Sequence, residues 1–392
     1  MSRGSVVFLL DSAPSTWTSQ EDRHLRLCQA LIRKGVRPVL VFSRPLRAEI
    51  ESRLRSSGAE IQAIHYGEGL AHYCRTLRQL VKRFSVTTAH IIFFDYFSAL
   101  PWIARLCGIP LVIYEMQNSG EFRATSWKRR ILRGRTKIMT SPVTKVIAIS
   151  EFVKRQLLAA GVPEGKIVVR YLGVDTERFV PNRHAREEWA DRFSIRSDEV
   201  ILSTVSYLRP FKNPQVLVEA CKELRERSIP VRLLVAGDGE MLPDLKALAK
   251  RVGVEDRVHW LGNVSDPRTL LQATDIFVLA SVGEAFGLVL AEAMACGVPV
   301  VGSRSGSLSE VVEEEYTGLL ARPRDAVAFA DAIERLSRDA PRRRQMAVRA
   351  VDRVRAHFTI GLAVDRTIDI YESLWTTSGF GSRGPAVSKV DR

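Results

Sequence analysis

Short apolar runs rich in β-branched residues alternate with amphipathic helical stretches along nearly the whole chain. In its first half, the runs predicted to be strands are Val6–Leu10, Pro38–Phe42, Ile61–His65, His90–Phe94, Pro110–Tyr114, Lys145–Ile149 and Ile167–Tyr171. Helical patterns, such as Asp22–Lys34 and Leu70–Phe84, lie between them. Near-continuous apolar strands indicate a parallel sheet that is buried on both faces. The alternation therefore predicts an α/β, doubly wound architecture.

The pattern lapses in the charged stretch 181–197 and then starts again. The later strand candidates are Ile201–Ser206, Val231–Ala236, Val258–Leu261, Ile276–Ala280 and Pro299–Gly302. A length of 392 residues suits two domains. We predict doubly wound domains over residues 1–180 and 198–355, a helix at about 361–375 that completes the first domain, and a disordered tail over 376–392. Such domains bind ligands at the carboxyl ends of their strands, so we expect the site in the cleft between them.

Composition and cysteine content limit the class of protein to which this chain can belong. Apolar residues make up 46% of the chain, and no run approaches the roughly 18 apolar residues of a membrane span. The run Val6–Leu10 is too short for the core of a signal peptide. The five cysteines form no C-x-x-C pair and the histidines show no ligand spacing, which predicts reduced thiols, no zinc and a cytoplasmic location.

The net charge of +14 lies entirely in the first half of the chain. Residues 1–180 contain 28 Lys and Arg against 14 Asp and Glu, whereas the remainder contains 30 of each kind. Such asymmetry indicates an anionic partner: nucleic acid, a membrane or an anionic substrate. The basic residues lie in no recognisable nucleic-acid module, so we expect no nucleic-acid partner.

The stretch 122–150 contains no acidic residue and eight basic ones. If 125–139 is helical, Trp127 and two isoleucines share one side and basic residues cover much of the rest. This pattern is typical of a helix that lies on an anionic membrane. A peripheral position at the cytoplasmic face of a membrane is therefore the alternative to a purely cytoplasmic location. A solvated helix that packs its apolar stripe on its own domain is the alternative. The predicted membrane-contact residues are Trp127, Lys128, Arg129, Arg130 and Arg133.

The densest motif begins where the strand Ile276–Ala280 ends. A turn follows the strand and a helix is expected to begin near Phe286. Free N–H groups and the positive dipole end of such a helix suit a diphosphate. Glu284 and Glu292 lie eight residues apart, a little over two helical turns, so they would face similarly and grip hydroxyls on two parts of an extended ligand. The alternative is an ordinary loop glutamate and an ordinary helix glutamate.

This segment resembles the E-x7-E signature of glycosyltransferase family 4, whose members have the GT-B architecture of two facing Rossmann-like domains. Further elements are similar to the family's in the same order. They are Ala148–Leu157, Gly173–Phe179, Val205–Lys212, Val235–Gly239, Val258–Gly262, Thr274–Ser281 and Ser309–Leu320. The resemblance covers residues 145–375 well, and residues 1–145 only in their alternation.

The resemblance implies a retaining enzyme that moves a hexose-type sugar from a nucleotide-sugar to a glycan, lipid-linked or glycolipid acceptor. The first domain would bind the acceptor and the second the donor. Glu284 would bind hydroxyls of the donor sugar and Glu292 those of the ribose, while Lys212 and Arg209 would neutralise the diphosphate. Other donor-binding positions are Phe286, Gly287, Leu288 and Gly237.

The chain also departs from the family pattern. Met116 stands where many relatives have a histidine that contacts the donor sugar, which puts the sugar preference or the activity in question. Asp95, Glu115 and Asn118 lie at expected strand ends and are candidates for the acceptor side, or else plain loop residues. No D-x-D string occurs, so we predict catalysis without a cofactor or a required divalent ion. The rival interpretations are a binding-only homologue and a phosphorylase or epimerase on the same scaffold.

Overall fold

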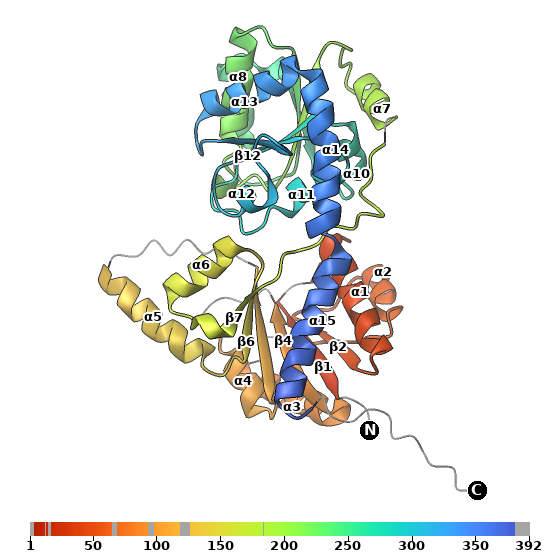
Figure 1. Ribbon diagram of the computed structural model, residues 1–392, viewed down its shortest axis with the longest axis vertical. Helices are drawn as coiled ribbons and strands as arrows, with labels where there is room; N and C mark the ends of the chain where they lie inside the picture. Colours follow the sequence, from red (N-terminus) through yellow and green to blue (C-terminus); the bar gives the residue numbers. More distant parts are fainter. Residues whose placement is uncertain are drawn as a thin grey trace, which may run out of the picture.

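The structure, a computed structural model, has two α/β domains stacked along its long axis (Figure 1). It describes residues 4–11, 13, 14, 17–64, 69–92, 98–117, 126–182 and 184–380. Within these ranges, no helix has both the length and the apolar character needed to cross a membrane. The predicted pair of doubly wound domains is confirmed.

The first domain is built on a parallel seven-stranded sheet of order β3-β2-β1-β4-β5-β6-β7. Its strands are β1 (Ser5–Leu10), β2 (Arg37–Phe42), β3 (Glu60–Ala63), β4 (Val86–Ile92), β5 (Leu111–Met116), β6 (Lys145–Ala148) and β7 (Ile167–Val169). Its helices are α1 (Ser19–Arg33), α2 (Ala48–Arg55), α3 (Leu70–Phe84), α4 (Leu100–Leu106), α5 (Ser126–Thr140) and α6 (Glu151–Ala160).

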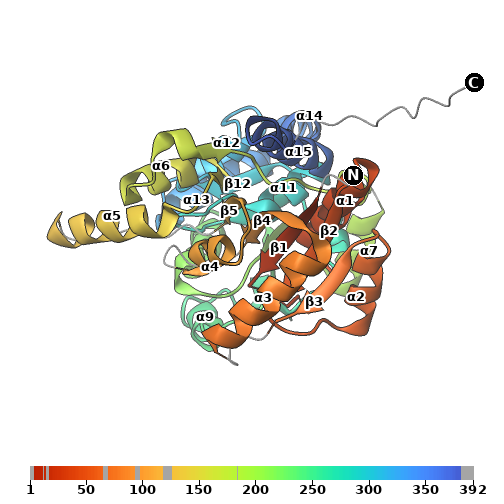
Figure 2. The same ribbon diagram turned by 90° about the horizontal axis from the view of Figure 1, so that it is seen from below.

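Both faces of this sheet are covered, because alternate side chains of a strand point to opposite faces. Phe8 of β1 belongs to a core with α1, α2 and the last helix of the chain, α15 (Ile360–Thr377). The neighbouring Val7 and Leu9 belong to a core with α3, α4 and α6. Figure 2 shows α15 and α3 on opposite sides of the sheet, with α5 at the edge of the domain.

The second domain has a parallel six-stranded sheet of order β10-β9-β8-β11-β12-β13. Its strands are β8 (Val200–Val205), β9 (Val231–Ala236), β10 (Val258–Gly262), β11 (Ile276–Leu279), β12 (Val300–Ser303) and β13 (Gly318–Ala321). Its helices are α7 (Ala185–Arg192), α8 (Gln215–Glu226), α9 (Leu242–Arg251), α10 (Arg268–Ala273), α11 (Leu288–Ala295), α12 (Leu308–Val311), α13 (Ala326–Arg338) and α14 (Ala340–His357).

The chain crosses between the domains twice, and the two crossovers pair with each other. Val174 N donates to Phe358 O at 2.8 Å, and Ile360 N donates to Val174 O at 3.0 Å. A Cβ on Gly173 would lie 2.4 Å from Thr359 O, so only glycine permits this approach. Beyond this point α15 returns to the first domain and packs on α1 (Figure 1).

A cluster of charged side chains is buried in the first domain beneath the start of α1. The Glu115 carboxylate accepts a hydrogen bond from Arg23 Nη1 at 2.7 Å and another from Arg170. His90 Nε2 lies 3.2 Å from this carboxylate, and its Nδ1 lies 2.6 Å from Tyr371 Oη of α15. Burial alone would raise the pKa of Glu115, but Arg170 and Arg23 hold this pKa well below its usual range. The ionised cluster therefore ties α1, the strands β4 and β5, the segment after β7 and α15 together.

Three boundaries differ from the sequence predictions. The charged stretch 181–197 contains α7, which packs on α10 in the second domain. A sixth strand, β13, follows α12 where no strand was predicted. The last helix runs to Thr377, past the start of the predicted tail, and residues 381–392 of that tail lie outside the described residues.

Candidate functional site

A cavity of about 450 Å³ lies between the two domains. The first domain contributes the start of α1, and the crossover contributes Arg178 and Phe179. The second domain contributes residues that follow its strands. The lining residues are Trp17, Thr18, Ser19, Arg178, Phe179, Val205, Ser206, Tyr207, Lys212, Ala236, Gly237, Asn263, Val264, Ser265, Pro267 and Glu292. Both sheets thus present their carboxyl ends to one space, as expected of doubly wound domains.

Lys212 and Glu284 meet at the point where the strand order of the second sheet reverses. Lys212 follows β8 and Glu284 follows β11, and these two strands are neighbours. A backbone hydrogen bond from Val282 N to Phe211 O, at 2.8 Å, joins the two loops. Lys212 Nζ lies 2.7 Å from Glu284 Oε2, and both side chains are largely buried. The site therefore holds an ammonium–carboxylate pair at the edge of the cavity.

Glycines allow the backbone to approach closely around this pair. Gly306 has φ +65°, and a Cβ there would lie 2.3 Å from Glu284 O. A Cβ on Gly237, which lines the cavity, would lie 1.9 Å from Ser206 O. Any larger residue at either position would displace a loop that carries a predicted site residue.

Glu292 lies on α11 and reaches the other side of the cavity. Its Oε1 accepts a hydrogen bond from Ser19 Oγ of the first domain at 2.5 Å. Burial is the main reason that the pKa of Glu292 is raised to about 7, while the Ser19 hydroxyl and Arg178 oppose the shift. Among the described residues, the hydrogen-bond partner of the Glu292 side chain is this one hydroxyl, which leaves the carboxyl acceptor capacity for hydroxyl groups of a ligand.

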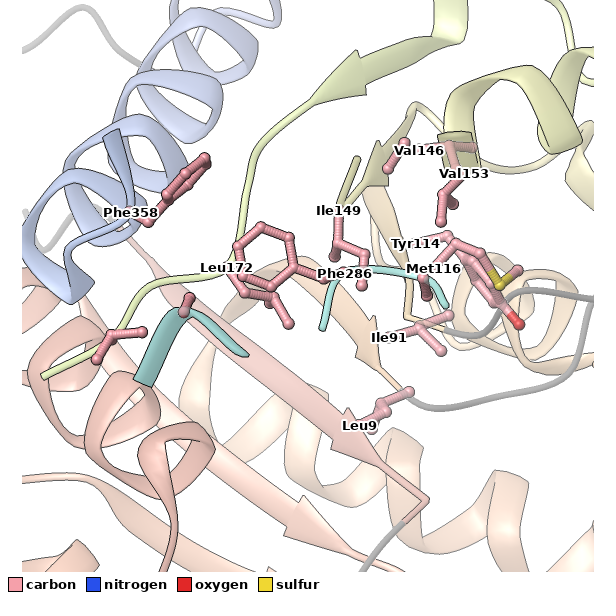
Figure 3. Close-up of a cluster of buried hydrophobic side chains, with 14 of the residues drawn as sticks. Leu9, Ile91, Tyr114, Met116, Val146, Ile149, Val153, Leu172, Phe286 and Phe358 are labelled. Atoms are coloured by element: carbon pink, nitrogen blue, oxygen red, sulfur yellow. The ribbon is translucent and has the colours of Figure 1, made fainter. Parts of the chain in front are cut away.

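The other residues predicted to bind the donor differ in how deeply they are buried. Phe286 is only 2% exposed, and its ring packs 6.1 Å from that of Tyr171 and 5.6 Å from that of Phe358. Figure 3 shows it among side chains of the first domain and the crossovers. Its side chain therefore anchors the loop and is not free to bind a ligand.

The helix α11 begins at Leu288, close to the start predicted near Phe286, and Gly287 takes a left-handed conformation and serves as the N-cap. Glu284 lies in the loop before this helix, so helical spacing alone does not determine how Glu284 and Glu292 face. No side chain of the described residues caps α11, so its first N–H groups remain available for an anion. Arg209 is exposed and stacks on Tyr207, and it does not line the cavity. The ligand contacts of these residues stay predictions.

The acceptor-side prediction for Glu115 is wrong. This carboxylate is 1% exposed and is neutralised by Arg23 and Arg170, so it has a structural role in the first domain. Met116 is also buried, at the end of β5, among the side chains shown in Figure 3. Asp95 and Asn118 lie outside the described residues.

Sequence reasoning missed Ser19 and Arg178. Ser19 is the first residue of α1, after a capping box in which Thr18 and Glu21 exchange hydrogen bonds. The string Thr-Ser-Gln-Glu after the first strand is a recognisable signal for such a helix start. Arg178 Nη2 lies 3.1 Å from Asp266 Oδ1, and Nη1 lies 3.6 Å from Asp22 Oδ2, so this arginine joins the two domains beside the cavity. No local pattern predicts that contact.

Glu292→Gln is expected to stabilise the ligand-free protein at pH 8 but not at pH 5. The folded-state pKa of about 7 lies above the value of 4.5 for a free glutamate, so the folded state binds this proton more tightly. The corresponding stability is present below pH 4.5 and is lost as the pH rises through 7. The substitution should therefore add about 1–3 kcal/mol at pH 8. Thermal unfolding of both proteins at the two pH values measures this; an equal difference at both would contradict it.

Comparisons with known proteins agree with this geometry. A family model described as "Glycosyltransferase Family 4" matches residues 21–178, and one described as "Glycosyl transferases group 1" matches residues 185–353. The N-acetyl-alpha-D-glucosaminyl L-malate synthase of Bacillus anthracis is 34% identical over 183 residues, 47% of each chain. The D-inositol 3-phosphate glycosyltransferase of Stackebrandtia nassauensis is 34% identical over 221 residues, 53% of this chain and 48% of that protein. The match thus spans about half the length of these relatives.

Solved structures share the fold over nearly the whole chain. A glycosyltransferase from Rickettsia africae has a TM-score of 0.79 at 20% identity, covering 95% of this chain and 98% of its own. Anabaena HepE, solved in complex with UDP, has a TM-score of 0.80 at 18% identity, covering 94% and 100%. Both domains are matched by models of one type of enzyme, and their arrangement is that of GT-B glycosyltransferases. The chain belongs to glycosyltransferase family 4.

Proposed function

We propose that this chain is a retaining glycosyltransferase that moves a hexose-type sugar from a nucleotide-sugar to a glycan, lipid-linked or glycolipid acceptor. The observation that carries the proposal is the cavity between the domains, which Lys212 and Glu292 both line, with Glu284 paired to Lys212 at its edge. HepE, which shares the fold, was solved with UDP and with UDP-glucose, so uridine nucleotides are the first probes to use.

Lys212 supplies the positive charge that the reaction needs. Negative charge builds on the β-phosphate as the bond to the sugar breaks, and a fixed ammonium at that position stabilises it. In the ligand-free protein this ammonium is neutralised by Glu284. An incoming diphosphate competes for Lys212 and leaves the Glu284 carboxylate to accept hydrogen bonds from sugar hydroxyls. Glu292 accepts hydrogen bonds from the ribose at the other end of the donor.

Retention follows if the acceptor attacks from the side on which the nucleotide leaves. The leaving phosphate then takes the acceptor proton, and no strong protein base is needed. This route tolerates Met116 at the position where relatives have a histidine. Arg178 adds a second cation to the cavity, whereas Arg209 lies outside it. That no divalent ion is required stays a prediction, for which activity in the presence of a chelator is the test.

Lys212→Gln is expected to lower turnover of the preferred donor about 10²–10³-fold, the usual effect of removing one transition-state contact. The donor is found first by a thermal-shift and hydrolysis screen of UDP-, GDP- and ADP-sugars. The matched control is Lys246→Gln, an exposed lysine on α9, which should leave turnover unchanged.

Other outcomes of that screen separate the rival functions. Binding of a nucleotide-sugar without any turnover by the wild-type chain would favour a non-catalytic, nucleotide-sugar-binding homologue. Consumption of inorganic phosphate without a nucleotide would favour a phosphorylase, and interconversion of the donor's sugar would favour an epimerase.

We further propose that the surface formed by α3, α4 and α5 contacts an anionic membrane. Residues 69–92, 98–117 and 126–148 contain one acidic residue, the buried Glu115. The exposed basic residues of this α3–α5 surface are Arg75, Arg78, Lys82, Arg83, Arg105, Arg133, Arg135 and Lys137. The side chains of the predicted contacts Trp127, Lys128, Arg129 and Arg130 lie outside the described part of α5.

Large apolar side chains are exposed among these cations. Trp102 is 40%, Leu106 68% and Ile138 60% exposed. The Trp102 indole donates to Ile138 O at 3.0 Å, and Arg78 Nη2 donates to Leu106 O at 3.3 Å, so the three helices form one continuous surface. Apolar side chains rimmed by cations, with no acidic residue in the described parts of these three helices, fit the headgroup region of an anionic bilayer. A membrane-bound enzyme would meet lipid-linked acceptors directly.

Neutralising Arg135 and Lys137 to glutamine and changing Leu106 to serine should lower binding to anionic vesicles about tenfold or more, since each cation near such a surface contributes about 1 kcal/mol. Co-sedimentation with phosphatidylglycerol-containing vesicles measures this. The control Lys246→Gln/Lys250→Gln, exposed on α9 of the second domain, should bind as the wild type does. Equal binding of the wild type to neutral vesicles, or no loss in the triple variant, would contradict the membrane contact.

A further inference from the structure

The N-terminus of α6, in the first domain, is capped by a carboxylate from the second domain. Glu310 Oε2 accepts a hydrogen bond from Glu151 N at 2.8 Å, and Oε1 accepts one from Phe152 N at 2.6 Å. The first N–H groups of a helix have no partner within the helix, and the positive end of its dipole favours a negative charge. The next free amide, Val153 N, donates to Ser150 Oγ at 3.1 Å. The first two amides of α6 therefore have their carboxylate partner only while the two domains are in contact.

The same helix start also holds the loop that carries Glu284. Ser150 Oγ donates to Ala285 O at 2.7 Å, and this bond is buried. The next residue of the loop, Phe286, packs against Tyr171 and Phe358 of the two crossovers. Figure 3 shows Phe286 close to Ile149, which precedes Ser150 in the chain. Two consecutive loop residues after Glu284 are thus fixed by the first domain and the crossovers.

Glu310 is connected to Glu284 through the second domain as well. Glu310 N donates to Ser307 O at 2.8 Å within the turn that begins α12. Ser307 in turn donates to Glu284 O from its backbone N at 2.9 Å and from its Oγ at 3.1 Å. Ser305 Oγ accepts a hydrogen bond from Gly283 N at 2.9 Å. Movement of α12 therefore moves the backbone that presents the Glu284 carboxylate.

Burial raises the pKa of the Glu310 carboxyl, and its hydrogen-bond donors and Arg155 oppose this shift and hold the carboxylate in place. Its side chain is 13% exposed, and Arg155 Nη2 of α6 lies 3.7 Å from it. The Tyr171 hydroxyl also bonds to it, and Arg353 Nη2 of α14 donates to the Glu310 carbonyl at 2.8 Å. Charge-assisted bonds to backbone amides are stronger than neutral ones. The contact between Glu310 and the amides of α6 therefore stabilises the interface between the two domains. We expect this interface to open when a donor enters.

We infer that Glu310 is a positioning residue that couples closure of the two domains to the placement of Glu284 beside Lys212. When the domains close, the start of α6 takes up the Glu310 carboxylate, and α12 and Ser307 hold the Glu284 backbone in place. When they open, α6 loses its cap and the loop loses its bond from Ser150. The role of Glu284 in transfer rests on the proposed function, whereas the contact itself does not.

The test compares Glu310→Gln with the matched control Glu314→Gln, whose carboxylate pairs with Arg304 within the second domain. Glutamine keeps one acceptor oxygen but adds N–H groups that face the amides of α6. Amide hydrogen exchange of the ligand-free proteins should be at least about tenfold faster at residues 151–152 and 281–287 in Glu310→Gln, because exchange follows local opening. Ser150→Ala, which removes the bond to Ala285 together with the bond from Val153 N but leaves Glu310 in place, should also speed exchange at 281–287.

Kinetics separate positioning from simple loss of stability. With UDP and UDP-glucose as probes, Glu310→Gln should lower kcat about tenfold to a hundredfold and leave the Kd for UDP within about twofold, since small misplacements reduce rate more than binding. Thermal unfolding checks that the variant is folded. Unchanged exchange at residues 281–287, or a loss confined to UDP affinity, would overturn the inference. If the wild type neither binds UDP nor turns over UDP-glucose, the proposed function fails for this donor, and the exchange measurement still decides the contact.

Discussion

The packing of Phe286 between the two crossovers is the interaction on which the rest of the site depends. This side chain comes from the second domain but is buried against Tyr171 and Phe358, where the chain passes between domains (Figure 3). The residues on either side of it are therefore fixed relative to both domains. On one side is Glu284, which faces Lys212, and on the other are Gly287 and the start of α11, which carries Glu292. One aromatic ring thus sets the position of both glutamates.

A second constraint lies in the first domain, where Glu115 is enclosed by Arg23 and Arg170. Arg23 belongs to the first turns of α1, so the cluster fixes the helix whose first residue, Ser19, bonds to Glu292 across the cavity. Arg170 immediately precedes the first crossover. Removing one partner of such a buried pair typically costs about 3–5 kcal/mol, so the cluster stabilises the frame on which the cavity is built.

The sequence alone predicted two doubly wound domains, most of their strands, and the residues Lys212 and Glu284 that follow β8 and β11, because buried parallel strands and the loops after them have local patterns. Lys212, Gly237 and Glu292 were all expected at the site and line one cavity. The errors have a common cause. Glu115 ends a strand as a ligand-binding residue would, but the arginines that enclose it are 92 and 55 residues away. Ser19 and Glu292 are hydrogen-bonded but lie 273 residues apart in the sequence, so no local pattern predicts this bond.

A crystal structure of the chain with UDP tests the central claim most directly. The account predicts a β-phosphate within hydrogen-bonding distance of Lys212 Nζ, about 3 Å, and ribose hydroxyls on Glu292. The pair between Lys212 and Glu284, now 2.7 Å apart, should be broken or shared with the phosphate. A nucleotide bound elsewhere, with the Lys212–Glu284 pair and the Ser19–Glu292 bond both intact, would contradict it.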